Sequence, residues 1–252
     1  MSRIARKKSA AGHYHIVFRG INRQTIFHDD EDRTVFLNRL KLVRAENGYE
    51  LIAFCIMNNH VHLLVRETGV EIGHIVRRVL SSFVFWYNGK YERVGHLFQD
   101  RFKSEPINSD AHLLRCVRYI LQNPVKAKTC ATVWDFPWSN AQLFLEEKPS
   151  FAEVGMIQEM LQPRAALIEF MEEREKDEFL EWETRPRLTD ERLREKIIKI
   201  LKGLKFNEIL DQGKKERKQL LMQILRIGGV NVAQIARVTG VPYHFIRYAG
   251  NR

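Results

Sequence analysis

The sequence CIMNNHVHLLV, residues 55–65, decides how this chain folds. It joins two apolar runs, Glu50–Met57 and His60–Arg66, through the pair Asn58-Asn59. Asparagine tolerates positive φ, so the pair predicts a tight hairpin between two strands. Alternate residues of a strand point to opposite faces, so His60 and His62 share one face of the predicted sheet.

Further elements are expected on both sides of this hairpin. Tyr14–Gly20 alternates its side chains as a strand does, and four carboxylates at residues 29–32 suit the start of a helix that ends at Asn47-Gly48. The remaining predictions are a helix over Glu71–Tyr91, an extended segment over Leu97–Ser104, and a helix from Asp110 as N-cap to Gln122, before Pro124. This order predicts an α+β fold, a ferredoxin-like antiparallel sheet with helices on one face.

Length and composition narrow the class of protein. The chain has 252 residues, 44% hydrophobic and 29% charged, as an ordinary globular protein does. No apolar run reaches the roughly 18 residues that span a bilayer, so we expect no membrane segment and, without a secretory signal, a cytoplasmic, nucleoid-associated protein. The three cysteines, Cys55, Cys116 and Cys130, have no C-x-x-C spacing, which argues against a disulfide framework or a structural zinc site.

Charge is distributed unevenly along the chain. The net charge is +10, from 41 basic and 31 acidic side chains. Residues 1–150 carry 22 basic and 15 acidic groups, residues 151–190 carry 5 and 11, and residues 191–252 carry 14 and 5. Two basic blocks favour a polyanionic partner, because Lys and Arg release counterions from phosphates, although a solvated basic surface gives the same count.

The same boundaries predict three parts: a domain over residues 1–150, an acidic helical linker over 151–190, and a small all-α domain over 191–252. In the last part, Lys214–Ile227 is expected as a helix. Asn231–Val238 and Pro242–Ala249, joined by Thr239-Gly240-Val241, form a helix-turn-helix pattern. An ordinary helical hairpin has the same pattern, but the positive charge favours DNA binding.

Two neighbouring imidazoles on one strand face can bind a metal ion, although His-x-His alone is a weak signal. Such a site needs a third ligand and a reacting group. Tyr119 and Asn123 lie four residues apart and therefore share a helix face, if the helix extends that far. Taken alone, a tyrosine at this position is more often a core aromatic whose hydroxyl is satisfied.

At this point the chain resembles the REP-associated tyrosine transposases, a branch of the single-tyrosine HUH transposases. The resemblance spans about residues 10–145. Its motifs are CIMNNHVHLLV (55–65), YHIVFRGINRQTIF (14–27), VGHLFQDRFKS (94–104), RYILQNPVKA (118–127) and WSN (138–140). The C-terminal domain resembles, more weakly, the helix-turn-helix of the replication initiator DnaA.

The resemblance implies specific roles for residues of this chain. His60, His62 and Asn123 match the ligands of a divalent cation, Mg²⁺ or Mn²⁺, and Tyr119 matches the nucleophile that forms a 5′-phosphotyrosine. The implied substrate is single-stranded or hairpin DNA with REP-like elements, and the implied assembly is a monomer or homodimer. Because metal-binding imidazoles are neutral, activity is expected to fall as the pH drops through the imidazole range.

Basic side chains near these motifs are expected to contact DNA. In the first domain the candidates for phosphate contacts are Arg77, Arg78, Arg101 and Lys103. In the helix-turn-helix, Arg237, His244 and Arg247 are expected to contact duplex DNA.

Three other functions compete with transposition. One is a DNA-binding regulator that keeps the HUH scaffold without catalysis. Another is an HUH replication or relaxase nuclease, which tends to carry a third histidine or paired tyrosines. The last is a plain metal-dependent hydrolase, which would form no covalent protein–DNA adduct. Whether the chain moves itself or is a domesticated enzyme does not follow from these motifs.

Overall fold

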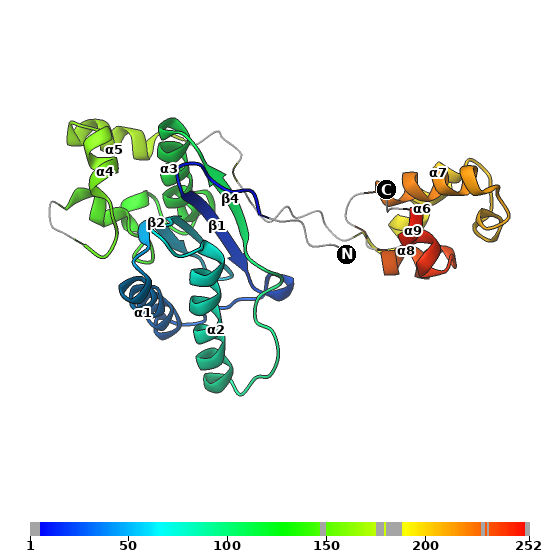
Figure 1. Cartoon of the computed structure of the whole chain (residues 1–252), viewed down its shortest axis with the longest axis horizontal. Coiled ribbons are helices and arrows are strands. Elements are labelled where there is room, and N and C mark those ends of the chain that lie inside the picture. The colour runs from blue at the N-terminus through cyan, green and yellow to red at the C-terminus, as the bar shows by residue number, and fades with distance from the viewer. Residues whose placement is uncertain are drawn as a thin grey trace. The chain divides into compact units, whose positions relative to one another are not determined.

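The computed structural model describes residues 6–146, 150–174, 179, 188–227, 230 and 232–249. The chain divides into two compact units, residues 1–182 and residues 183–252, which we describe separately (Figure 1). The elements of the first unit are β1 (His13–Arg19), η1 (Ile21–Arg23), α1 (Asp30–Asn47), β2 (Glu50–Ile56), β3 (His60–Arg66), α2 (Ile72–Lys90), β4 (Lys103–Ile107), α3 (Asp110–Lys126), η2 (Val133–Asp135), η3 (Ala141–Leu145), α4 (Gly155–Met160) and α5 (Arg164–Glu172).

One four-stranded sheet organises the first unit. Its strand order is β2-β3-β1-β4, and every neighbouring pair is antiparallel. The central strands β3 and β1 pair with Val17 opposite His62, and β2 places Cys55 opposite the same histidine. The expected α+β class is confirmed, and His62 lies on a strand that has a neighbour on each side.

The hairpin between β2 and β3 is confirmed, but not for the predicted reason. Its closing bond runs from the Met57 amide to the His60 carbonyl at 2.9 Å. Neither Asn58 nor Asn59 has a positive φ. Instead, the Asn58 carbonyl accepts hydrogen bonds from the amides of Ile26 and Phe27, and the Asn59 carbonyl accepts one from Gly20. Contacts with the segment after β1 therefore hold this turn in place.

Helices α1 and α2 cover one face of the sheet. Asp29 caps α1 through a reciprocal capping box with Asp32, and Gly48 ends it with φ 71°. The buried aromatic rings of this face pack against one another, with Phe36 lying 5.6 Å from Phe18 and 5.2 Å from Phe83 between ring centroids. This face forms one of the two apolar cores of the unit.

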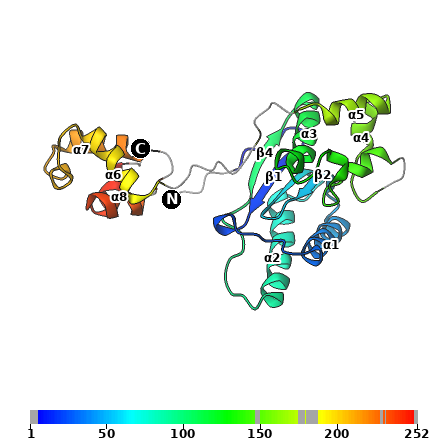
Figure 2. The ribbon, with the colours of Figure 1, turned by 180° about the vertical axis from the view of Figure 1, so that it is seen from behind.

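Helix α3 covers the opposite face, so the expectation of helices on one face only is wrong (Figures 1 and 2). Leu113, Val117 and Ile120 of α3 are buried against Ala53 and Leu64 of the sheet. The apolar stripe of α3 docks on the face that alternate residues of the strands present to it. Ala53 and Cys55 of β2 and Leu64 of β3 supply apolar side chains to this face, beside the two β3 histidines.

Two boundaries also differ from the predictions. Strand β4 begins at Lys103, and in the segment before it Phe98 makes an isolated bridge with Gly20. Helix α3 is capped by Ser109 and continues through Pro124. A proline inside a helix leaves the carbonyl four residues earlier without its usual partner, and here the Asn123 side chain donates to that Ile120 carbonyl at 3.4 Å.

Helices α4 and α5 belong to the first unit, which corrects the expected linker over 151–190. Ile157, Leu167 and Met171 are buried in the same core cluster as α3. The Gln122 side chain of α3 donates to the Met171 carbonyl at 2.9 Å. Much of the expected acidic linker, residues 175–178 and 180–187, lies outside the described residues.

The second unit is helical. It contains α6 (Asp190–Leu201), η4 (Phe206–Ile209), α7 (Lys214–Leu225), α8 (Val232–Thr239) and α9 (Tyr243–Ala249). Gly240, with φ 73°, begins the turn between α8 and α9, and the buried Val241 anchors it. The expected pair of helices is present from Val232 on, whereas Asn231 lies outside the described residues. None of the described helices combines the length and apolar character needed to cross a bilayer.

Candidate active site

The two histidines of β3 lie together on the sheet face that α3 covers. Their ring centroids are 5.0 Å apart, with the rings at 80° to each other. His62 is 2% exposed, whereas His60, at the start of the strand, is half-buried. The predicted pairing of the imidazoles is therefore present, at the end of the strand nearest the β2–β3 turn.

A hydrogen-bonded amide sets the orientation of the His60 ring. Its Nδ1 lies 2.6 Å from the Asn59 side-chain oxygen. The Asn59 Nδ2 donates to the Arg23 carbonyl at 3.1 Å, which leaves the side-chain oxygen as the acceptor for His60. An oxygen cannot donate here, so the proton lies on Nδ1 and the lone pair of His60 lies on Nε2.

The Nδ1 of His62 is also engaged. It lies 3.0 Å from the Nε2 of His15, a buried histidine on β1. The Nε2 of His62 is therefore the ring nitrogen left to meet a ligand. Each predicted ligand histidine thus makes its Nδ1 contact within the protein, as metal-binding histidines usually do.

Tyr119 of α3 lies against this group. Its ring centroid is 5.7 Å from that of His62 and 5.6 Å from that of His15, edge-on to both. The ring is 1% exposed, because Phe179 packs on it at 4.8 Å between centroids. The Lys126 ammonium lies 4.4 Å from the centre of the same ring. Tyr119 is thus buried, but among imidazoles and beside a cation as well as against an aromatic ring.

Asn123 lies one helical turn after Tyr119 and is half-buried. Its Nδ2 donates to the Tyr119 carbonyl at 2.9 Å and to the Ile120 carbonyl at 3.4 Å. The amide therefore keeps its oxygen for a further partner. Within the described ranges, no group of three or more His, Cys, Asp or Glu could hold a metal ion. Two Nε2 atoms and one amide oxygen nevertheless make a donor set that suits a divalent cation.

Both β3 imidazoles are held neutral. Burial, with the nearby Arg19 guanidinium, lowers the pKa of His60 to about 4. Burial also lowers the pKa of His62 well below its ordinary value, and the cations Arg19 and Lys126 and the neighbouring imidazoles add to this. The neutral form that binds metal thus persists to lower pH than the reference pKa of His suggests. This moves the expected acid loss of activity below the ordinary imidazole range.

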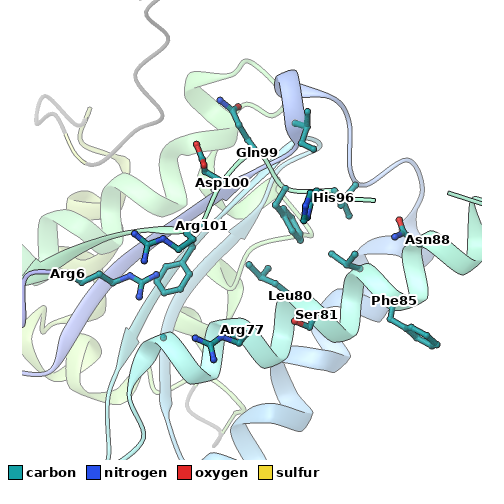
Figure 3. Close-up of a pocket in the computed structure, with 16 residues that line it drawn as sticks. Arg6, Arg77, Leu80, Ser81, Phe85, Asn88, His96, Gln99, Asp100 and Arg101 are labelled. Atoms are coloured by element: carbon teal, nitrogen blue, oxygen red, sulfur yellow. The ribbon is translucent and has the colours of Figure 1, made fainter. Parts of the chain in front are cut away.

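A second feature is a cavity of about 890 Å³ between α2 and residues 96–102. Arg77 faces it from the helix, while Arg6 and Arg101 lie close together on its other side (Figure 3). Burial, followed by the charges of Arg101 and Arg77, lowers the pKa of Arg6, which is a sign of concentrated positive charge. Two of the predicted phosphate contacts therefore share one cationic cavity.

The other predicted DNA contacts lie outside this cavity. Arg78 forms an ion pair with Glu46 and a hydrogen bond with the Asn47 side chain. Lys103 begins β4 and pairs with Val17 of β1. These two basic residues are therefore placed apart from the arginine group of the cavity.

In the second unit, the predicted contacts divide between two helices. Arg237 of α8 donates to both Asp190 oxygens, at 2.7 and 2.8 Å. His244 and Arg247 are exposed on α9, and Tyr248 beside them is 79% exposed. The exposed face of α9 thus presents aromatic, imidazole and guanidinium groups, while Arg237 is engaged in an ion pair.

The order of elements and the site can be compared with known families. Residues 8–123 match the family described as "Transposase IS200 like". This range begins before β1 and ends at Asn123, so it contains all four predicted site residues. Residues 8–123 belong to the IS200-like transposase family. The family match implies DNA cleavage or transposase activity. Members of the family are typically metal-dependent.

One solved structure of similar fold supports the α+β architecture of the first unit. A REP-associated tyrosine transposase bound to a REP hairpin is 19% identical, with a TM-score of 0.51 over 62% of this chain and 92% of that one. A candidate transposase from Deinococcus radiodurans is 20% identical, with a TM-score of 0.35 over 47% and 95% of the two chains. A search of curated proteins finds no match. At these identities, the first likeness supports the α+β fold of the transposase unit.

Sequence reasoning missed several side chains of the candidate site. Alternation along β1 gives the face of the sheet on which His15 lies. Only the pairing of β1 with β3 brings it toward His62. Lys126 lies two helical turns after Tyr119, a spacing that places both on one face. Phe179 is distant in sequence from every motif, and nothing in its local pattern points to Tyr119.

Proposed function

We propose that this protein is a metal-dependent DNA transesterase that cleaves and rejoins single-stranded or hairpin DNA through a 5′-phosphotyrosine on Tyr119. One observation carries the proposal. The ring of Tyr119 lies beside His62, and both β3 histidines make their Nδ1 contacts within the protein. These contacts support one site in which Tyr119 would be the nucleophile and the Nε2 atoms of His60 and His62 would bind the cation.

Mg²⁺ or Mn²⁺ fits the available donors. The ligands would be the Nε2 atoms of His60 and His62 and the side-chain oxygen of Asn123. When bound, the cation supplies Lewis-acid polarisation of a phosphate oxygen. The low pKa values of both histidines keep these ligands neutral and available.

The protein side chains carry the bond changes. The Tyr119 oxygen attacks phosphorus and forms a P–O bond, while the bond from phosphorus to the 3′ oxygen breaks. The phenolic proton is lost and the departing 3′ oxygen gains a proton, so the charge balances. The Lys126 ammonium lies 4.4 Å from the centre of the Tyr119 ring, so a positive charge lies beside the proposed nucleophile.

The covalent product explains why a tyrosine suits strand rearrangement. The phosphate ester to the 3′ oxygen is replaced by a phosphate ester to the tyrosine, so the phosphate remains a diester. A second 3′ hydroxyl can therefore attack it, release Tyr119 and join a new strand. Attack by water would instead end the reaction as hydrolysis.

The cationic groups of the first unit support a DNA partner. Arg77 and Arg101 share one cavity with Arg6, and Arg78 and Lys103 are further basic side chains outside it. Lys and Arg bind the backbone of a single strand without regard to sequence. The relative of known structure that binds a REP hairpin supports hairpin DNA as the substrate. A DNA-cleaving enzyme of this kind would act in the cytoplasm beside the nucleoid.

The helix pair α8–α9 is proposed to bind duplex DNA. The proposed DNA contacts are His244 and Arg247 of α9 and Arg237 of α8. Replacing both His244 and Arg247 with alanine should weaken duplex binding, whereas cleavage of a short hairpin should continue. Unchanged duplex affinity would remove support for this role.

A second function, DNA binding without catalysis, is favoured by one observation. Tyr119 is 1% exposed and lies under Phe179, which is not how an open nucleophile is presented. A regulator on this scaffold would bind hairpin DNA and form no adduct. The covalent-adduct assay described next separates the two functions.

The test uses a labelled hairpin DNA, Mn²⁺ and a denaturing gel. The wild-type protein should form a slowly migrating covalent adduct, and Tyr119→Phe should form none. Tyr14→Phe is a matched control, because Tyr14 is also buried but faces the α1–α2 side of the sheet. Cleavage without adduct would indicate a hydrolase, and hairpin binding without cleavage would indicate a regulator.

A further inference from the structure

A buried histidine of the neighbouring strand β1 contacts His62. His15 of β1 is completely buried, and its Nε2 lies 3.0 Å from the Nδ1 of His62. The two rings are stacked at 5.3 Å between centroids, with 16° between their planes. In the sheet, His15 pairs with Leu64, which makes it a diagonal neighbour of His62 on the same face. The contact is thus built into the register of the two central strands.

A carboxylate lies near the other ring nitrogen of His15. Glu105 of β4 pairs with His15 across the sheet, and its Oε2 lies 3.7 Å from the His15 Nδ1. A carboxylate attracts a proton to the ring nitrogen that faces it. With its proton on Nδ1, a neutral His15 offers a lone pair on Nε2, so the proton between the two rings belongs to His62 Nδ1.

We propose that His15, oriented by Glu105, is a positioning residue that holds the proton of His62 on Nδ1 and so keeps His62 Nε2 available to the catalytic cation. The inference deepens the proposed function and rests on it. His62 would otherwise share its proton between two ring nitrogens, and a molecule with the proton on Nε2 could not bind metal. His15 acts through His62 and not on the substrate.

The arrangement at His60 supports this interpretation. There, the Asn59 side-chain oxygen holds the proton on Nδ1. The two β3 histidines therefore have different partners, an amide and an imidazole, but the same ring nitrogen is engaged in each. Such an arrangement sets both ligands before the cation arrives, and partners of this kind typically contribute 10–100-fold to metal affinity.

Metal binding by the full-length protein tests the proposal without the cleavage reaction. The free Mn²⁺ signal in electron paramagnetic resonance gives the Kd for wild type, His15→Leu, His15→Gln and Glu105→Gln. His15→Leu should weaken Mn²⁺ binding about 10–100-fold, because it removes the acceptor. His15→Gln should recover much of the loss, since an amide oxygen can accept from His62 Nδ1. Glu105→Gln should have a smaller effect.

His13→Leu is the matched control. His13 lies on the same strand and face, two residues before His15, and is half-buried. It should leave Mn²⁺ affinity unchanged, since its strand partners are Arg66 and Ile107 rather than a metal ligand. Equal weakening in His13→Leu and His15→Leu would indicate a general packing effect and overturn the proposal.

Nitrogen-15 NMR of the histidine rings gives a second readout. His62 in the metal-free wild-type protein should carry its proton on Nδ1, and in His15→Leu the proton should be shared between both nitrogens. A proton on His62 Nε2 in wild type would overturn the inference. If wild type shows no Mn²⁺ binding that depends on His60 and His62, the proposed function itself fails. If that binding is present and indifferent to His15, only this inference fails.

Discussion

The two faces of the central sheet are packed with different kinds of side chain. On the α1–α2 face, Phe18, Phe36 and Phe83 pack as rings against rings. On the α3 face, the corresponding layer contains the rings of His15, His62 and Tyr119, with centroids 5.3–5.7 Å apart. The spacing of rings is similar on both faces. The three α1–α2 rings are apolar, whereas on the α3 face a contact between ring nitrogens joins His15 and His62 inside the apolar core.

This difference indicates where the protein can tolerate change. An apolar core depends on volume and shape, so its loss is felt as stability. A buried polar cluster depends on which atom carries each proton, so its loss is felt as chemistry even where the fold survives. The following predictions test that separation.

The largest effect is expected from the metal ligands of the α3 face. His60→Ala and His62→Ala should each reduce hairpin cleavage by more than about 10³-fold, since a cation contributes several kcal/mol and 1.36 kcal/mol is a factor of ten. Cleavage kinetics with Mn²⁺ and circular dichroism provide the measurement. Full activity in either variant would contradict the proposed difference between the faces, because the β3 histidines would then have only a packing role.

On the opposite face, Phe83→Ala should lower the free energy of unfolding by about 3–5 kcal/mol, because it opens a cavity in a fully buried ring cluster. Mn²⁺ affinity of the folded protein should stay unchanged. Chemical denaturation and Mn²⁺ titration measure the two quantities. Should Mn²⁺ affinity fall together with stability, the faces are coupled and the proposed separation does not hold.

Acid should destabilise the α3 face through its neutral histidines. The pKa of folded His60 is about 4, against about 6.5 for an unfolded histidine, so the unfolded chain binds more protons between these values. Stability from this group is complete above about pH 6.5 and is lost as the pH falls to about 4, by on the order of 3 kcal/mol. His62 should add to the loss in the same direction.

Denaturation of the metal-free protein in a chelator, at several pH values, measures this effect. His60→Gln should show a smaller fall in unfolding free energy between pH 6.5 and pH 4 than wild type does. Equal falls in both proteins would mean that His60 ionises normally in the folded state.

The smallest effect is expected from the aromatic cover of Tyr119. Phe179→Ala removes a ring contact at 4.8 Å, and such contacts are worth about 0.5–1.5 kcal/mol. If DNA displaces this ring to reach Tyr119, cleavage should rise about two- to tenfold. Phe170→Ala, on α5 of the same core, is the control and should give no increase. A decrease in Phe179→Ala would instead assign this ring a role in holding Tyr119.

The sequence was sufficient for the parts of the site that lie within one element. The alternation of β3 placed His60 and His62 on one face, and helical spacing placed Asn123 one turn after Tyr119 in α3. Contacts between elements were not predictable from such local patterns. The His15–His62 hydrogen bond needs the pairing of β1 with β3, and the cover of Tyr119 comes from a residue 60 positions later.

Local propensity also misjudged two details of the fold. Pro124 was expected to end α3, but the side chain of Asn123 satisfies the carbonyl that the proline leaves, and the helix continues to Lys126. The asparagines at the β2–β3 turn form the hairpin without positive φ, because the segment after β1 supplies donors to their carbonyls. In both places tertiary contacts outweighed the intrinsic preference of a residue.

The most direct test of the account is mass spectrometry of the covalent adduct. Hairpin DNA cleaved in Mn²⁺ is digested with nuclease, and the protein with trypsin, which cuts after Arg118 and Lys126. The account predicts that the peptide Tyr119–Lys126 carries the added nucleotide on its tyrosine. A nucleotide on any other tyrosine, or cleaved DNA with a free 5′ phosphate and an unmodified Tyr119 peptide, would contradict it.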